Sequence, residues 1–295
     1  MSNPYKTRVG GATVTVFVPY DCRNNCPFCI NKREYADCSG FSLPAILESI
    51  HTMDGITPYC DFVFTGGEPL ADLGALQQML DAIPATHKIY INTTFPVHDH
   101  TSAEEMLDFT RRNRDKITCI NISRHLQKYV EESPDEVIAR IACPTRINCV
   151  LYKHYPADRL PAYVDRFVPY GIPVQFRYDY TETTPENLYE EEHDRILQDL
   201  KRLFTYRGLD GCRMRNGFHF SYRGLHMTYH KTLPYSTITE TDEHGVTYDI
   251  LYDIIIKQNG DIHSDWTGVA LDVERYRRVV FEPYDLHVID GVADF

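Results

Sequence analysis

The sequence predicts an α/β fold in which six strand–helix units form an open, partial β/α barrel. The first 180 or so residues alternate β-branched, apolar runs of strand length with amphipathic runs of helix length. Strands that alternate with helices favour right-handed crossovers and a parallel sheet. Six units are too few to close an eight-stranded barrel. We therefore expect an open sheet, with a C-terminal α+β cap over its open side.

Each expected element has its own local signal. Ser42 is a helix N-cap followed by Pro44 in the first turn, and Ser102 has Glu105 at capping-box spacing. The strands are expected at residues 12–20, 61–69 (running into a glycine turn), 88–95, 116–123, 145–152 and 172–180. The helices between them are expected at residues 42–53, 73–83, 102–113, 133–142 and 157–171.

The pattern changes after residue 186. A helix is expected at 187–204, a strand at 217–222, and a hairpin within 246–265 that turns at "QNGD". No Ser/Gly/Pro-rich linker or charge run marks a boundary. We therefore expect a core at 1–185 and a C-terminal cap and substrate-binding extension at 186–295, both within one domain.

Composition restricts the partners. The 295 residues are 43% hydrophobic and 24% charged, as in a globular enzyme, and the net charge of −12 argues against a binder of duplex nucleic acid. No apolar run approaches membrane-spanning length, and the N-terminal residues lack the apolar core of a secretory signal. We expect a cytoplasmic protein without a membrane partner.

Three of the nine cysteines, Cys22, Cys26 and Cys29, lie within eight residues directly after the first strand. In a reducing compartment such a group indicates a metal centre rather than disulfides. Structural zinc uses four ligands, commonly in CxxC pairs, whereas this spacing is CxxxCxxC with no fourth ligand nearby. Iron–sulfur clusters are normally held by four cysteines, so three would leave one iron without a protein ligand.

The loop "CRNNCPFC", including the aromatic Phe28, resembles the cluster-binding loop of the radical S-adenosylmethionine (SAM) superfamily. The resemblance implies a [4Fe-4S] cluster on the three cysteines, with SAM on its free iron. In that family an electron from the cluster cleaves SAM to methionine and a 5′-deoxyadenosyl radical, which abstracts hydrogen from a substrate. It further implies oxygen sensitivity and an electron donor such as flavodoxin or ferredoxin. Because only Cys212 follows Cys149, we expect a single cluster and no cysteine-rich extension.

A second motif, "TGGEP", follows the second expected strand and resembles the family segment that contacts the amino group of SAM. Its glycines allow close backbone approach, and its glutamate supplies a carboxylate for an ammonium group. The resemblance extends to polar positions at later strand ends, near the SAM carboxylate or ribose. The SAM-binding positions implied are Phe28, Gly66, Gly67, Glu68, Pro69, Asn92, Ser123, Arg124 and Asn148.

The motifs leave the substrate open. Residues 201–231 are rich in basic, histidine and aromatic residues in an otherwise acidic chain, which favours a pocket for a small anionic substrate, a nucleotide or phosphorylated metabolite. A solvated basic surface is the alternative. The candidate substrate-binding residues are Arg177, Arg213, Arg215 and His219. Other hypotheses are a peptide-modifying or glycyl-radical-activating radical SAM enzyme, and a non-enzymatic iron–sulfur or zinc sensor or scaffold.

Overall fold

The computed structural model describes most of the chain, and the candidates Arg213 and Arg215 lie outside the described residues. The described residues are 3–7, 12–18, 22, 24–29, 40–57, 60–96, 101–179, 191–209, 217–231, 238–251, 253–264 and 270–277. Among these, no helix is long and apolar enough to cross a lipid bilayer.

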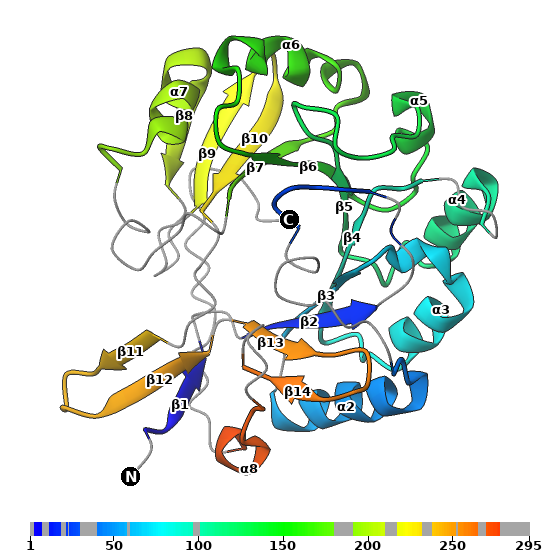
Figure 1. Ribbon diagram of the computed structural model, residues 1–295, viewed down its shortest axis with the longest axis vertical. Coiled ribbons are helices and arrows are strands. Elements are labelled where there is room, and N and C mark those ends of the chain that lie inside the picture. Colours follow the sequence, from blue (N-terminus) through cyan, green and yellow to red (C-terminus); the bar gives the residue numbers. More distant parts are fainter. Residues whose placement is uncertain are drawn as a thin grey trace.

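A curved sheet of eleven strands forms the body of the molecule, in the order β14-β13-β2-β3-β4-β5-β6-β7-β10-β9-β8 (Figure 1). Its two end strands do not pair, which confirms the expected open barrel. Neighbouring strands from β2 to β7 are all parallel. These six are β2 (Thr13–Val18), β3 (Asp61–Gly66), β4 (Lys88–Thr93), β5 (Cys119–Ser123), β6 (Thr145–Leu151) and β7 (Val174–Tyr178).

The helices lie along the outer side of this arc (Figure 1). The Ser42 N-cap is confirmed by a bond from the Ala45 amide, and Ser102 and Glu105 form the expected capping box. The helices are α2 (Leu43–Ile56), α3 (Leu73–Asp81), α4 (Ala103–Arg112), α5 (Asp135–Ile138), α6 (Leu160–Asp165), α7 (Arg195–Leu203) and α8 (Val273–Tyr276). Short 3₁₀ turns are η1 (Pro69–Ala71), η2 (Ala157–Arg159) and η3 (Val168–Tyr170).

Two expected helices are much shorter than the sequence suggested. The segment 133–142 forms only the single turn of α5. The segment 157–171 is divided into η2, α6 and η3, with Pro161 near the start of α6 and Pro169 near the start of η3. Proline lacks the amide hydrogen that a continuous helix would need at these positions.

The C-terminal strands extend the sheet at both ends. On one side β10 (Leu225–His230) runs parallel to β7, followed by β9 (Gly217–Tyr222) and β8 (Thr205–Leu209). On the other side β13 (Asp253–Ile256) runs parallel to β2 and forms the expected hairpin with β14 (Ile262–His263). A separate three-stranded sheet contains β1 (Tyr5–Thr7), β12 (Thr247–Leu251) and β11 (Ile238–Thr241).

Alternate residues of the parallel strands face opposite sides of the sheet. One set, including Phe64, Ile91 and Ile122, packs with the helices in the hydrophobic core. The other set lines the inner, concave face and is largely polar, with residues such as Asn121 and Gln175. The carboxyl ends of the parallel strands share one rim, where such folds place their chemistry. Both sequence motifs lie on that rim.

Candidate cofactor site

The cysteine loop follows β2 and comes close to the rim. The amide of Cys29 donates to the carbonyl of Cys26 (3.1 Å), which folds the loop into a turn. All three cysteine side chains are partly accessible. Burial raises the pKa of the Cys22 thiol, its hydrogen bonds with Asn24 oppose this, and the nearby Glu68 carboxylate and Cys29 raise it further.

Asn24, inside the loop, is a site residue that the sequence motifs did not single out. Its side-chain amide approaches Cys22 Sγ (3.6 Å) and Thr94 Oγ1 (3.4 Å), and its oxygen accepts from the amide of Glu131 (2.7 Å). A buried amide that satisfies three partners holds its loop in one position. Asn24 therefore connects the cysteine loop to the end of β4 and to the loop that follows β5.

Phe28 is buried against an aromatic group from the loops after β5 and β6. Its ring lies edge-on to His125 (4.8 Å between ring centroids) and Tyr129 (5.6 Å), and tilted against Tyr152 (5.6 Å). The thiol of Cys26 also approaches the carbonyl oxygen of Tyr129 (3.9 Å). Aromatic contacts of this kind anchor the loop without using the thiols. The assignment of Phe28 to SAM binding stays a prediction.

Gly66 allows the two motifs to meet. It has φ of +124°, and an added Cβ would lie 2.7 Å from the amide nitrogen and 2.9 Å from the carbonyl carbon of Val18, and closer still to its carbonyl oxygen. The next residue, Gly67, donates its amide hydrogen to the same Val18 carbonyl (2.8 Å). Only glycine tolerates this combination of conformation and contact. The end of β3 is thus pressed against the residue that leads into the cysteine loop.

Glu68 is buried at the rim and bonded on both carboxylate oxygens. One oxygen accepts from the Leu70 amide (3.1 Å) and the Thr93 hydroxyl, and the other from the amide and hydroxyl of Thr94 (both 3.0 Å). Burial raises the pKa of this carboxyl group, while the hydrogen bonds oppose the rise. Glu68 therefore joins η1 to the end of β4, and a contact with the ammonium group of SAM stays a prediction. Pro69 begins η1 directly after it.

Arg124 requires a correction. We expected its guanidinium to pair with a SAM carboxylate, but its side chain is 0% exposed. It donates to the carbonyl oxygens of Thr94 (2.8 Å), Ser123 (2.9 Å) and Ser133 (3.2 Å). Those bonds and complete burial turn the guanidinium away from solvent. In the structure Arg124 braces the loops behind the rim.

The other strand-end candidates lie together on the concave face. Asn121 donates to Asn92 (2.7 Å) and accepts from Arg146 Nε (2.7 Å), so these three residues form a row across β4, β5 and β6. In the next row Ser123 is paired in register with Asn148. The buried side-chain oxygen of Asn148 has no hydrogen-bond partner within the described part of the chain. Such an oxygen is suited to a donor from a ligand.

The same face carries a group of basic side chains on β6, β7, β9 and β10, which we call the basic wall: Arg146, Arg177, His219, His226 and His230. His219 Nδ1 lies 3.1 Å from His226 Nε2, with the rings stacked 5.4 Å apart, and Arg177 is in register with His230. The pKa of His230 lies well below its ordinary value. Burial is the largest cause, and the charges of Arg177 and Arg146 lower the pKa further. Arg177 and His219, two of the expected substrate residues, therefore occur together, whereas Arg213 and Arg215 are outside the described residues.

The chemistry of the three cysteine side chains fits an iron–sulfur cluster. Within the described ranges, no three His, Cys, Asp or Glu side chains are grouped to hold one metal ion. Three thiols on a short turn, braced by Asn24 and Phe28, match a cluster with three protein ligands. Residues Cys22, Cys26 and Cys29 would hold it.

Comparisons with known proteins agree with this chemistry. The model of the 4Fe-4S single cluster domain family matches residues 9–133, which include both motifs. No curated protein matches the chain in sequence.

Solved structures of SuiB from Streptococcus suis have a similar fold. The structure bound to S-adenosylmethionine has a TM-score of 0.53 at 13% identity, covering 97% of this chain and 66% of SuiB. The structure bound to the precursor peptide SuiA also has a TM-score of 0.53, at 14% identity, covering 97% and 67%. A further SuiB structure has a TM-score of 0.51 at 14% identity, covering 86% and 60%. The chain thus spans about two thirds of the length of SuiB, and at these identities the likeness concerns the fold.

The open parallel barrel, the three-cysteine loop and the matching domain model are together typical of a protein that holds an iron–sulfur cluster. Residues 9–133 match the 4Fe-4S single cluster domain family, and the fold is similar to that of SuiB bound to S-adenosylmethionine.

Proposed function

We propose that this protein is a radical SAM enzyme that abstracts hydrogen from a small, anionic substrate, a nucleotide or another phosphorylated metabolite. The observation that carries the proposal is the meeting of the two motifs at one rim, where Gly66 and Gly67 contact Val18 at the entrance to the cysteine loop. A scaffold or sensor would need the cysteines alone, and nothing in that role requires the second motif beside them.

When bound, the cluster would supply the electron that cleaves SAM to methionine and a 5′-deoxyadenosyl radical. The chain's own residues position and shield that chemistry. Asn24 and Phe28 fix the loop, and Asn92, Ser123 and Asn148 offer polar groups to SAM on the concave face. An electron donor such as flavodoxin or ferredoxin, and a cytoplasmic location, belong to the same proposal.

The basic wall supports an anionic substrate. Two guanidinium groups and three imidazoles lie on adjacent strands of the concave face, in a chain of net charge −12. Guanidinium groups bind phosphate and carboxylate with paired hydrogen bonds, and their charge is worth more where water is excluded. The wall would thus hold the anionic part of the substrate on the inner side of the barrel.

A peptide substrate is the second candidate, because one of the similar SuiB structures is bound to the precursor peptide SuiA. The two candidates predict different stimulants of SAM cleavage. The reconstituted protein would be assayed anaerobically for 5′-deoxyadenosine with pools of nucleoside monophosphates, sugar phosphates, uncharged nucleosides, or peptides. Stimulation by the anionic pools alone supports the proposal, and stimulation by peptides alone replaces it with the second candidate.

The basic wall is tested by Arg177→Gln, with Arg112→Gln on the outer end of α4 as the matched control. Loss of one guanidinium from a phosphate site should raise KM for the stimulating substrate by about tenfold or more. The control should leave KM unchanged. Equal KM values for both variants and the wild type would remove the wall from substrate binding.

A further inference from the structure

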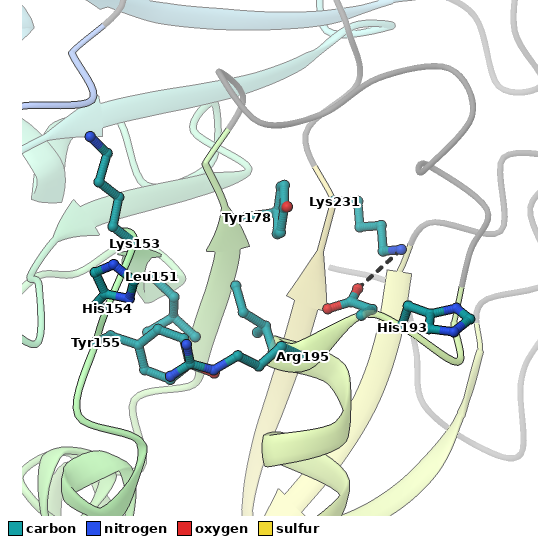
Figure 2. Close-up of a pocket in the computed structure, with 10 residues that line it drawn as sticks. Leu151, Lys153, His154, Tyr155, Tyr178, His193, Arg195 and Lys231 are labelled. Carbon is teal, nitrogen blue, oxygen red and sulfur yellow. Dashed lines mark ion pairs between the residues drawn. The ribbon is translucent and has the colours of Figure 1, made fainter.

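A cavity of about 440 Å³ lies at the rim where β6, β7 and β10 end, beside the first turn of α7. Leu151, Tyr178 and Lys231 line it from the three strand ends, and Arg195 lines it from the start of α7 (Figure 2). Asp194, the N-cap of α7, also lines the cavity. This volume falls in the range of small-molecule sites.

The cavity is on the other side of the sheet from the basic wall. Tyr178 directly follows Arg177, and Lys231 directly follows His230. Successive residues at a strand end point to opposite faces. Arg177 and His230 belong to the concave face, whereas Leu151 and Tyr178 belong to or pack against the helix-side core. The cavity is therefore separate from the proposed radical site.

Its charges favour an anion. Among the described lining residues, three are cations, Lys153, Arg195 and Lys231, and one is a carboxylate, Asp194. That carboxylate is fully engaged: it lies 3.0 Å from Lys231 Nζ, accepts from the Leu197 amide (3.0 Å) and accepts from the Tyr229 hydroxyl (3.0 Å). Lys231 and Asp194 form a buried ion pair, with side chains 4% and 3% exposed. The charges of this pair nearly cancel. Arg195 and Lys153 therefore determine the sign of the net charge of the cavity lining.

Arg195 is held for binding by its neighbours. Its guanidinium carbon lies 5.4 Å from the ring centroid of Tyr155, and Figure 2 shows the guanidinium beside that ring. The hydroxyl of Tyr155 donates to Asp199 (2.8 Å). Asp199 is shared between Arg195 (3.8 Å) and Arg202 (3.0 Å), so one carboxylate faces two guanidinium groups. A guanidinium packed against an aromatic ring can still present its N–H edge to a carboxylate or phosphate.

We propose that this cavity is a second binding site, for the carboxylate or phosphate group of a small organic anion, with Arg195 as its main determinant. Leu151, Ile196 and Tyr178 would contact the apolar body of the ligand. Lys153 plays a lesser part, since Figure 2 shows its side chain extending away from the other labelled residues. Tyr152, the residue between Leu151 and Lys153, contacts Phe28 of the cysteine loop (5.6 Å). A ligand in the cavity would therefore contact Leu151, the sequence neighbour of the Tyr152 ring that packs against the cysteine loop.

The test is a calorimetric titration of the full-length, reconstituted protein with phenyl phosphate, benzoate and inorganic phosphate, each measured separately. Arg195→Gln should weaken the Kd of the preferred probe by at least about tenfold. Arg202→Gln is the matched control, because Arg202 is on the same helix, shares Asp199, and has a side chain 60% exposed against 61% for Arg195, but does not line the cavity. It should change the Kd by less than about twofold.

Arg177→Gln separates this site from the basic wall and should also leave the Kd unchanged. Phenyl phosphate and benzoate should both bind more tightly than inorganic phosphate. Tighter binding of phenyl phosphate would identify phosphate as the preferred group, and tighter binding of benzoate would identify carboxylate. Absence of binding to the wild type, equal weakening by Arg195→Gln and Arg202→Gln, or loss of binding only in Arg177→Gln would each overturn the proposal. Because the readout is binding, the result is independent of whether the protein cleaves SAM.

Discussion

The carboxylate of Glu68 and Thr94 are joined by two hydrogen bonds of 3.0 Å, one from the threonine amide and one from its hydroxyl. The same hydroxyl is approached by Asn24 of the cysteine loop (3.4 Å), and the carbonyl of Thr94 accepts from Arg124 (2.8 Å). Thr94 thus connects the GGEP turn, the cysteine loop and the buried arginine. Both motifs are held by one hydrogen-bond network at the end of β4.

Glu68→Gln should weaken this network. The amide NH₂ of glutamine would face donors that the carboxylate now accepts, leaving buried groups unpaired. We expect the free energy of unfolding in urea to fall by about 1–3 kcal/mol. Glu48→Gln, at an exposed position on α2, should have almost no effect. An unchanged unfolding free energy together with weaker SAM binding would instead assign Glu68 purely to the ligand.

Gly66→Ala should disrupt the meeting of the motifs. The added methyl group would overlap the backbone of Val18, and alanine is strained at φ of +124°. We expect a loss of more than about 2 kcal/mol in unfolding free energy and poor retention of iron. Gly55→Ala in α2, where a Cβ meets nothing within 4 Å, should be neutral or stabilise by up to about 1 kcal/mol. Equal behaviour of the two variants would contradict the close approach at Gly66.

Arg124→Lys should act on stability. A lysine cannot reproduce the bonds to three carbonyl oxygens from one planar group, so buried acceptors would lose their donors. We expect a cost of roughly 3 kcal/mol by urea unfolding, against almost none for Arg112→Lys at the end of α4. If the variant were as stable as the wild type and bound SAM more weakly, the original assignment of Arg124 to the SAM carboxylate would be restored.

His125 should make the fold sensitive to acid. Burial, and then the charge of Arg124, lowers its pKa to about 3, while its side chain accepts from the Val150 amide (3.2 Å). The unfolded chain binds a proton near pH 6.5 that the folded chain refuses, so this contribution to stability is present above that pH and is lost as the pH falls toward 3. By pH 5 the loss should be about 2 kcal/mol.

The acid sensitivity is measured by urea unfolding of the wild type and His125→Gln at pH 7 and pH 5. The variant should be less stable at pH 7 but lose less stability on acidification. His51→Gln, at an exposed position on α2, should show the pH dependence of the wild type. A His125→Gln variant that loses as much stability as the wild type between the two pH values would refute a buried neutral histidine.

The sequence predicted the parts of the fold that depend on local signals. The cap at Ser42 and the capping box of Ser102 and Glu105 are short-range hydrogen bonds, and both form as expected. The pairing of β10 with β7 and of β13 with β2 joins segments far apart in the chain, and no local pattern encodes it.

The site was predictable to the same degree. The spacing of the cysteines and the GGEP residues identified the motifs, but not the tertiary contacts of Asn24 or the burial of Arg124. Arg124 directly follows a strand, as residues that bind ligands often do. Only the tertiary structure shows that its guanidinium is bonded to backbone carbonyl oxygens of the surrounding loops. His226 and His230 were identified as part of the basic wall only from the strand pairing, which sets His230 in register with Arg177 and brings His226 close to His219.

We propose that Cys22, Cys26 and Cys29 hold the cluster whose electron cleaves SAM. The most direct measurement is anaerobic reconstitution of the wild type, Cys26→Ala and Cys143→Ala, followed by iron counting and assay of 5′-deoxyadenosine with SAM and dithionite. Cys143 is the control because it is buried beside the Thr110 carbonyl oxygen (3.2 Å) and is not in the loop. The wild type and Cys143→Ala should each hold about four irons and form 5′-deoxyadenosine, whereas Cys26→Ala should do neither. Equal product from wild type and Cys26→Ala, or a colourless zinc-loaded wild type, would contradict it.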